Sequence, residues 1–215
     1  QKTAYEIKEC DWSSDVCSSD LLKERFHIIK NVESFNITPT EYERIKLSVS
    51  RNCEPFEYKG YNIHKDQASI GLSAICERAR REKRKIYFSG QGADEILSDY
   101  GFGGTKIFKH SGFGGLFPNK LEGFFPWYSF YNGTQIQYLN KEEYIAGNYG
   151  IETRYPFLDK KLVQEFLWLT SELKNKKYKN ALDEYLQINN FPSDVSEKRG
   201  FHVSESGKNK GKNIK

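Results

Sequence analysis

The stretch that decides the fold is R-K-I-Y-F-S-G-Q-G-A-D-E-I-L-S-D-Y, residues 84–100. Its β-branched and aromatic run at residues 86–88 predicts a buried strand, which Gly90 and Gly92 end at a corner. The acidic residue Asp94 then opens a helical pattern. Glycines let backbone N–H groups approach a ligand, and the start of a helix favours anions. The stretch therefore predicts a site for nucleotide phosphates at the carboxyl end of a strand, with Asp94 holding Mg²⁺.

A strand followed by G-x-G also has a purely structural interpretation. Tight turns from strand to helix use glycine for steric reasons, and Asp94 could serve as the cap of the helix. On this stretch alone the structural turn and the phosphate site are equal alternatives.

Two further motifs separate these alternatives. Residues 150–159 read G-I-E-T-R-Y-P-F-L-D, and residues 196–201 read S-E-K-R-G-F. Together with S-G-Q-G-A-D-E-I at residues 89–96, they resemble the synthetase domain of the asparagine synthase family over residues 22–203. That family carries S-G-E/Q-G-x-D-E, G-h-E-x-R-x-P-F-L-D (h, hydrophobic) and R-x-K-x-G-F in this order.

The resemblance implies an α/β fold of the adenine nucleotide alpha hydrolase-like or N-type ATP pyrophosphatase class. Such a fold has a parallel sheet with flanking helices, here followed by a mainly helical C-terminal part. Apolar periodicity agrees with it. It predicts strands over residues 24–30 and 85–88, a loop over 53–66, and helices over 38–50, 67–81, 141–149, 159–170, 178–188 and from 93 onward.

The ends of the chain suggest an internal fragment of a longer protein, since methionine is absent and Gln1 lies within a helical pattern. Residues 1–21 are interpreted as a partial helix followed by W-S-S-D-V-C-S-S-D-L, which resembles a translated sequencing adapter. Residues 22–203 form the predicted synthetase-like domain, truncated at its N-terminus, and residues 204–215 a disordered basic tail.

The family resemblance also implies a reaction. ATP adenylates the side-chain carboxylate of aspartate, pyrophosphate leaves, and ammonia from glutamine attacks the acyl-adenylate to give asparagine. The expected cofactors are ATP and Mg²⁺, and the expected small-molecule partners are aspartate, ATP and ammonia. We expect an N-terminal glutaminase domain and an S-G-G-x-D-S loop upstream, and therefore little or no synthetase activity from this chain alone.

The resemblance gives each motif residue a role. Ser89, Gly90 and Gly92 would shape the turn around the nucleotide and the intermediate, and Asp94 would bind Mg²⁺ and pyrophosphate. The catalytic residues would be Lys198, a mobile cation at the developing phosphate charge, and Gln91, which could orient the acyl-adenylate.

Three other residues are candidates for support of the site. Glu95 neighbours the proposed metal ligand. Glu152 and Arg154 fit either an internal ion pair under the site or substrate contacts. The P-F-L segment that follows them is interpreted as structural, and Asp159 as the cap of the next helix.

Two departures from the family pattern leave the acceptor open. Gln91 stands where many members have glutamate, and a neutral amide cannot act as a base. Ser196 and Glu197 replace the R-x of the lysine motif, which weakens the assignment of Lys198. A related amidotransferase or ligase acting on another carboxylate is therefore the alternative function.

Composition argues against other classes of protein. Hydrophobic residues make up 37% and aromatic residues 15%, which indicates a globular chain, and neither a membrane span nor a signal peptide is expected. Most of the net charge of +4 comes from the tail, so a nucleic-acid or protein-binding module is the weaker interpretation. The G-F-G-G copies in residues 101–133 predict a mobile loop beside the site.

The spacing of the cysteines bears on the cellular compartment in which the protein is expected. None of the four forms a C-x-x-C pair, so reduced thiols and a cytoplasmic location are expected. They are Cys10, Cys17, Cys53 and Cys76. The oligomeric state is left open, with a homodimer as one option.

Overall fold

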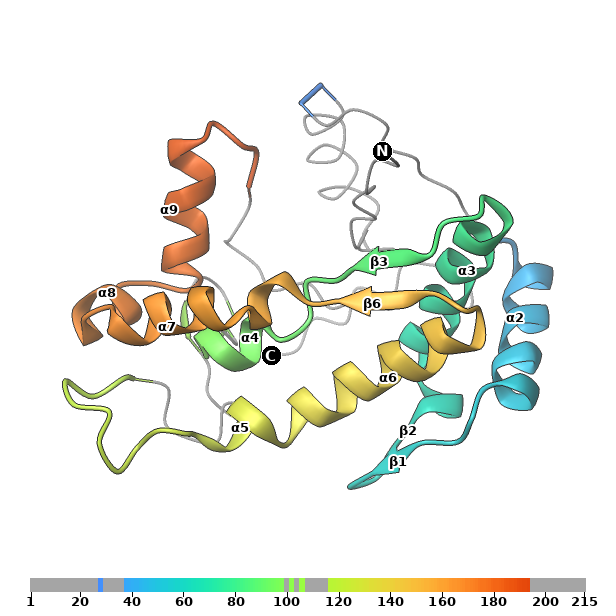
Figure 1. Cartoon of the computed structure of the whole chain (residues 1–215), viewed down its shortest axis with the longest axis horizontal. Helices are drawn as coiled ribbons and strands as arrows, with labels where there is room; N and C mark the ends of the chain where they lie inside the picture. The colour runs from blue at the N-terminus through green and yellow to red at the C-terminus, as the bar shows by residue number, and fades with distance from the viewer. Residues whose placement is uncertain (1–26, 29–36, 99–100, 103–104, 107–115, 194–215) are drawn as a thin grey trace.

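The computed structural model describes residues 27–28, 37–98, 101–102, 105–106 and 116–193, and it is mainly helical (Figure 1). Two short strands, β3 (Ile86–Phe88) and β6 (Glu152–Arg154), pair in parallel between flanking helices. The predicted parallel sheet is thus present in a small form, and the more specific fold class stays a prediction.

Helix α2 (Pro39–Asn52) forms where the periodicity predicts it. Its N-terminus is a capping box, in which the Thr38 hydroxyl accepts from the Glu41 N–H and the Glu41 carboxylate accepts from the Thr38 N–H. The helix buries the predicted face, Tyr42, Ile45 and Val49.

Helix α3 (Gln67–Arg81) has the predicted bounds. The Asp66 carboxylate caps it by accepting from the Ala68 N–H at 3.2 Å. Its interior face packs against α2 and against α6 (Thr134–Asn148). The predicted core positions Ile70, Ala74, Ile75 and Ala79 are all buried.

The two described cysteines lie in the core around α2 and α3. Cys53 and Cys76 are free thiols, in agreement with the predicted reduced state. Both are buried, and burial raises the pKa of each.

Two local predictions in the first half are wrong. The expected loop over 53–66 contains a hairpin of β1 (Glu57–Tyr58) and β2 (Tyr61–Asn62), followed by the turn η1 (Ile63–Lys65). Positive φ angles at both connecting residues, Lys59 (45°) and Gly60 (83°), form the tight turn that closes it. The expected strand over 24–30 is contradicted at 27–28, which lie in a turn.

The second half holds more elements than predicted. After α4 (Ala93–Leu97) come the hairpin of β4 and β5, α5, α6, β6, η2, α7, α8 and α9. Their bounds are β4 Gly101–Phe102, β5 Thr105–Lys106, α5 Tyr128–Tyr131, η2 Pro156–Leu158, α7 Lys160–Trp168, α8 Ser171–Asn175 and α9 Asn180–Ile188.

Two helices of this half show where the sequence pattern worked and where it did not. Helix α6 begins at Thr134, ahead of the predicted residue 141. Its first turns were missed because they bury a polar side chain, Gln135, which apolar periodicity does not mark. Helix α7 is capped as predicted, since the Asp159 carboxylate accepts from the Lys161 N–H at 2.9 Å.

A second core of aromatic rings lies beneath α4. Trp127 packs edge-on against Phe117 and Phe130, with ring centroids 5.2 and 5.0 Å apart. Its indole N–H donates to the backbone carbonyl of Glu95 at 2.8 Å. This buried bond ties the short helix α4 to the aromatic core.

Gly92, between β3 and α4, lies against the segment that follows β6. Its φ of +90° is in the left-handed region, and a Cβ on it would lie 2.4 Å from Cδ2 of Leu158. Glycine is therefore required here both for its backbone conformation and for the close approach of η2.

We predict that Gly92→Ala destabilises the chain by roughly 2–4 kcal/mol, since it combines left-handed backbone strain with a clash against the half-buried Leu158 side chain. Gly60→Ala is the matched control, because Gly60 has φ +83° but a Cβ added to it would meet no atom within 4 Å. Gly60→Ala should lower the free energy of unfolding by only about 1–2 kcal/mol, because it adds backbone strain without a clash. Urea unfolding measures both, and equal losses would contradict the packing argument.

Candidate functional site

The parallel pairing of β3 and β6 brings the two motifs together. Both strands end on the side of the molecule where α4, α7 and α9 lie (Figure 1). Backbone bonds extend the pairing beyond the strands, from the Glu152 N–H to the Lys85 carbonyl at 2.8 Å and from the Ser89 N–H to the Arg154 carbonyl at 2.9 Å. The S-G-Q-G turn and the T-R-Y-P-F-L-D segment thus leave the sheet side by side.

Ser89, Gly90, Gln91 and Gly92 form one turn, as predicted from the sequence. The Ser89 side chain is 3% exposed, and its hydroxyl accepts from the Gln91 N–H at 3.1 Å. This hydrogen bond between a buried serine and the backbone two residues later stabilises the turn. Gly90 is exposed and Gln91 half-buried. The exposed corner leaves its backbone open to a ligand, and contact with a nucleotide stays a prediction.

Asp94 follows this turn in the first turn of α4. Its carboxylate oxygen Oδ1 lies 3.4 Å from Nζ of Lys179, which precedes α9. The two side chains are 24% and 30% exposed, so solvent reaches both. Sequence reasoning missed Lys179, because no local pattern connects it to a residue in a distant segment of the chain.

Glu95 lies in the interior and is 1% exposed. Its backbone carbonyl accepts the Trp127 indole bond, so this residue helps to hold α4 in place. Its role in supporting the site stays a prediction.

Glu152 and Arg154 form an ion pair with each other at 2.7 Å, but the pair is not internal as one interpretation predicted. Both side chains are 56% exposed, since alternate residues of a strand point to one face and this face of β6 is open. An exposed ion pair of this kind contributes about 0–1 kcal/mol to the stability of the folded chain. Thr153, between them, points inward and donates to Glu143 on α6.

Several predicted features lie outside the described residues. Lys198 is one of them, so its catalytic role stays a prediction, as does the role of Gln91. The segment 1–21, the tail 204–215, Cys10 and Cys17 also lie outside, as do residues 103–104 and the second G-F-G-G copy, residues 112–115.

The donor set around Asp94 fits a magnesium ion that arrives with phosphate groups. The part of the chain that the structure describes contains no group of three or more His, Cys, Asp or Glu side chains placed to coordinate a metal ion. Mg²⁺ commonly binds through one or two carboxylates, with water and phosphate oxygens completing its shell. One solvent-accessible carboxylate beside an exposed glycine corner meets that requirement.

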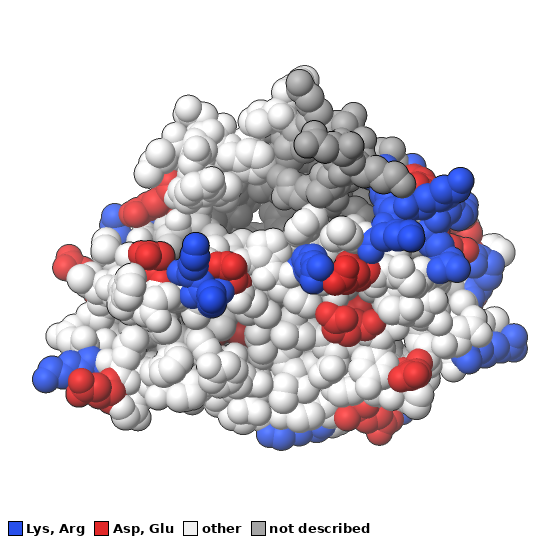
Figure 2. Space-filling model, viewed as in Figure 1, with Lys and Arg blue, Asp and Glu red and all other residues white. Residues whose placement is uncertain are grey.

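Charged side chains are mostly intermixed on the face shown in Figure 2, with basic residues gathered near the end of α3. Arg78 pairs with Glu82 at 3.0 Å, and Arg80 donates to the Tyr149 carbonyl at 2.6 Å. These contacts are those of a solvated helix end, where basic side chains also interact favourably with the helix dipole.

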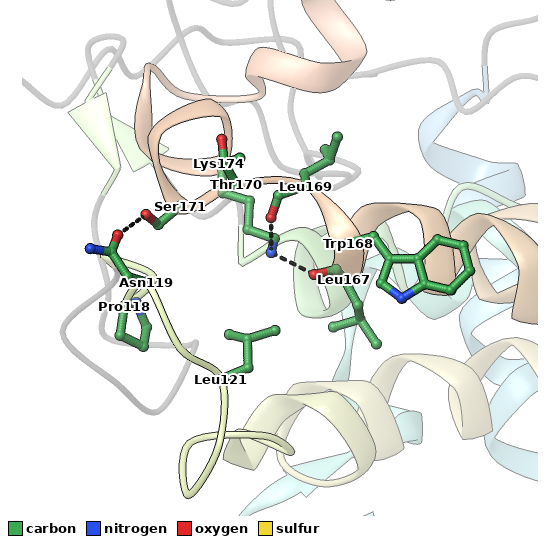
Figure 3. Close-up of a pocket in the computed structure, with 9 residues that line it drawn as sticks. All are labelled: Pro118, Asn119, Leu121, Leu167, Trp168, Leu169, Thr170, Ser171 and Lys174. Atoms are coloured by element: carbon green, nitrogen blue, oxygen red, sulfur yellow. Dashed lines mark hydrogen bonds between the residues drawn. The ribbon is translucent and has the colours of Figure 1, made fainter.

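A hollow of about 500 Å³ lies elsewhere, between α7, α8 and the segment before α5 (Figure 3). Nζ of Lys174 donates there to the carbonyls of Leu167 and Leu169, at 2.8 and 2.6 Å. Burial lowers the pKa of Lys174. None of the sequence-predicted site residues lines this hollow, and its lysine serves as a cap for the end of α7.

We predict that Lys174→Met destabilises the chain by about 1–3 kcal/mol, because the two carbonyls lose their buried donor. Lys176→Met is the control, since Lys176 pairs with Glu184 on the exposed surface and should cost less than about 1 kcal/mol. Chemical unfolding followed by circular dichroism compares them, and a Lys174 variant as stable as wild type would refute the capping role.

Comparisons with known proteins agree with the motif assignment. The chain is 27% identical over 146 residues to an asparagine synthetase (glutamine-hydrolyzing) of Gallus gallus, a match that covers 63% of this chain and 22% of that protein. It is 26% identical over 147 residues to a protein assigned as asparagine synthetase (glutamine-hydrolyzing) 1 in Methanocaldococcus jannaschii, covering 66% and 25%.

The chain is distantly similar to glutamine-hydrolysing asparagine synthetases. It spans about a fifth to a quarter of the length of these relatives. No protein-family profile matches it. Of the helices in the described residues, none has the length and apolar character needed to cross a bilayer.

Proposed function

We propose that this chain forms part of an ATP-dependent ligase that adenylates the side-chain carboxylate of aspartate and transfers ammonia to it, giving asparagine. Glutamine hydrolysis, the source of the ammonia, is assigned to a part of the enzyme outside this chain. The observation that carries the proposal is the meeting of the glycine turn and the P-F-L-D segment at the carboxyl ends of two parallel strands, with Asp94 beside them. Ligands of α/β proteins bind at such strand ends.

The chain's own residues would act on the leaving group. The exposed Gly90 would offer its backbone N–H to a phosphate oxygen, which a Cβ would keep at a distance. Asp94 would hold Mg²⁺, which supplies positive charge to the departing pyrophosphate. The internal bond from the Gln91 N–H to the Ser89 hydroxyl keeps the corner in shape before the ligand arrives.

Gln91 favours one alternative, a related ligase with a different carboxylate substrate. It is half-buried in the turn, beside the exposed corner. Its amide can donate and accept hydrogen bonds but cannot take a proton from ammonia. The side chain would therefore orient an acyl-adenylate, whatever its acyl group.

Binding of Mg²⁺–pyrophosphate tests the proposed phosphate site. In isothermal titration of the 215-residue chain, we expect binding that Asp94→Asn weakens at least about tenfold, because it removes the charge that holds the metal. Glu172→Gln, which removes an exposed carboxylate from α8, should leave the affinity unchanged. Equal affinity in wild type and the Asp94 variant would contradict the proposal.

The acyl group can be identified with sulfamoyl analogues of acyl-adenylates. The asparagine synthetase proposal predicts that the β-aspartyl analogue binds the chain at least about tenfold more tightly than the acetyl analogue, because the site would contact the rest of aspartate. If the two analogues bind alike, or the glutamyl analogue binds best, the alternative ligase is favoured. Fluorescence titration measures all three.

A further inference from the structure

A group of lysines, K-K-Y-K at residues 176–179, connects α8 to α9. Each of its three lysines has an acidic partner, and two of these pairs stay within the α8–α9 corner. The third reaches α4, which directly follows the glycine turn. The pairs are Lys176 with Glu184 (2.7 Å), Lys177 with Asp183, and Lys179 with Asp94 (3.4 Å).

The backbone places Lys179 for this contact. Its φ of 52° and ψ of 32° are in the left-handed region, which is unfavourable for a lysine by roughly 1–2 kcal/mol. Tyr178 and Asn180 on either side are buried, at 2% and 4% exposure, and the Lys179 carbonyl accepts the first bond of α9 from the Asp183 N–H at 2.8 Å. The lysine stem therefore starts from a constrained position.

Asp94 is placed just as firmly from the other side. Gly92, two residues before it, packs against Leu158, and the Trp127 indole holds the backbone of Glu95 immediately after it. Both ends of the ion pair thus depend on core packing. The backbone of each partner is fixed by packing, unlike the backbone and side chains of most ion pairs on an open surface.

We propose that Lys179 is a positioning residue for Asp94, an internal counter-cation that holds the carboxylate until a divalent cation displaces it. This inference rests on the proposed function of Asp94. A divalent ion and an ammonium group repel each other at 3–4 Å. The ammonium of Lys179 therefore lowers the affinity of the Asp94 carboxylate for a metal ion as long as both contact it. The lysine side chain is 30% exposed and flexible, and its ammonium can swing into solvent when the metal binds.

Metal affinity is the quantity that distinguishes a competing lysine from a merely structural one. If the ion pair only fastens α9 to α4, removing the ammonium changes stability and leaves metal binding as it was. If Lys179 competes with the metal, removing its charge strengthens binding at Asp94. A conservative arginine should keep the competition, since it keeps the charge.

The test is a titration of the full 215-residue chain with the Mn²⁺–pyrophosphate complex, in which electron paramagnetic resonance measures the unbound complex. We expect wild type to bind this complex through Asp94, Lys179→Met to bind it roughly three- to tenfold more tightly, and Lys179→Arg to bind it within about twofold of wild type. Lys176→Met, which breaks the neighbouring surface pair, should match wild type. Circular dichroism confirms that each variant is folded.

The outcomes separate this inference from the proposed function. Binding that Asp94→Asn abolishes, with Lys179→Met no tighter than wild type, would overturn the role of Lys179 and leave the metal role of Asp94 intact. Binding that Asp94→Asn does not weaken, or its absence in all variants, would overturn both. Tighter binding in Lys179→Met that also requires Asp94 would support both.

Discussion

The site depends on the parallel backbone pairing of β3 with β6. These strands are only three residues long, yet the bond from the Ser89 N–H to the Arg154 carbonyl carries the pairing into the glycine turn. Two motifs that are far apart in the chain therefore emerge in contact. Gly92 then allows Leu158 to approach closely enough to pack the turn against η2. A side chain at Gly92 would disturb that contact and, through it, the position of Asp94.

The two cores act on the site from different sides. The core of α2, α3 and α6 holds the strands, with Tyr87 of β3 2% exposed within it. The aromatic core around Trp127 holds α4 through the carbonyl of Glu95. The glycine turn follows β3, which the first core holds, and its Gly92 lies against Leu158, which packs on the second core. This arrangement suits a site that must be formed before a charged substrate arrives.

Local signals made much of the fold predictable. Helices α2 and α3 followed from apolar residues at helical spacing and from polar caps such as Thr38 and Asp66, and β3 from its aliphatic and aromatic run. Strand β6 was missed because E-T-R has the character of a polar loop, although its central Thr153 is buried by tertiary pairing. The glycine turn was predictable from its motif. The pair of Asp94 with Lys179 was not, because it depends on how α9 packs.

Hydrogen exchange at the paired strands tests the central claim most directly. The amide protons of Ser89 and Glu152 each donate to the other motif's segment, to Arg154 and Lys85 respectively. We expect both to be strongly protected and to exchange at similar rates, because one cooperative unit holds them. If either proton exchanged at the rate of an unstructured peptide while the amides of α3 stayed protected, the two motifs would not be joined as described.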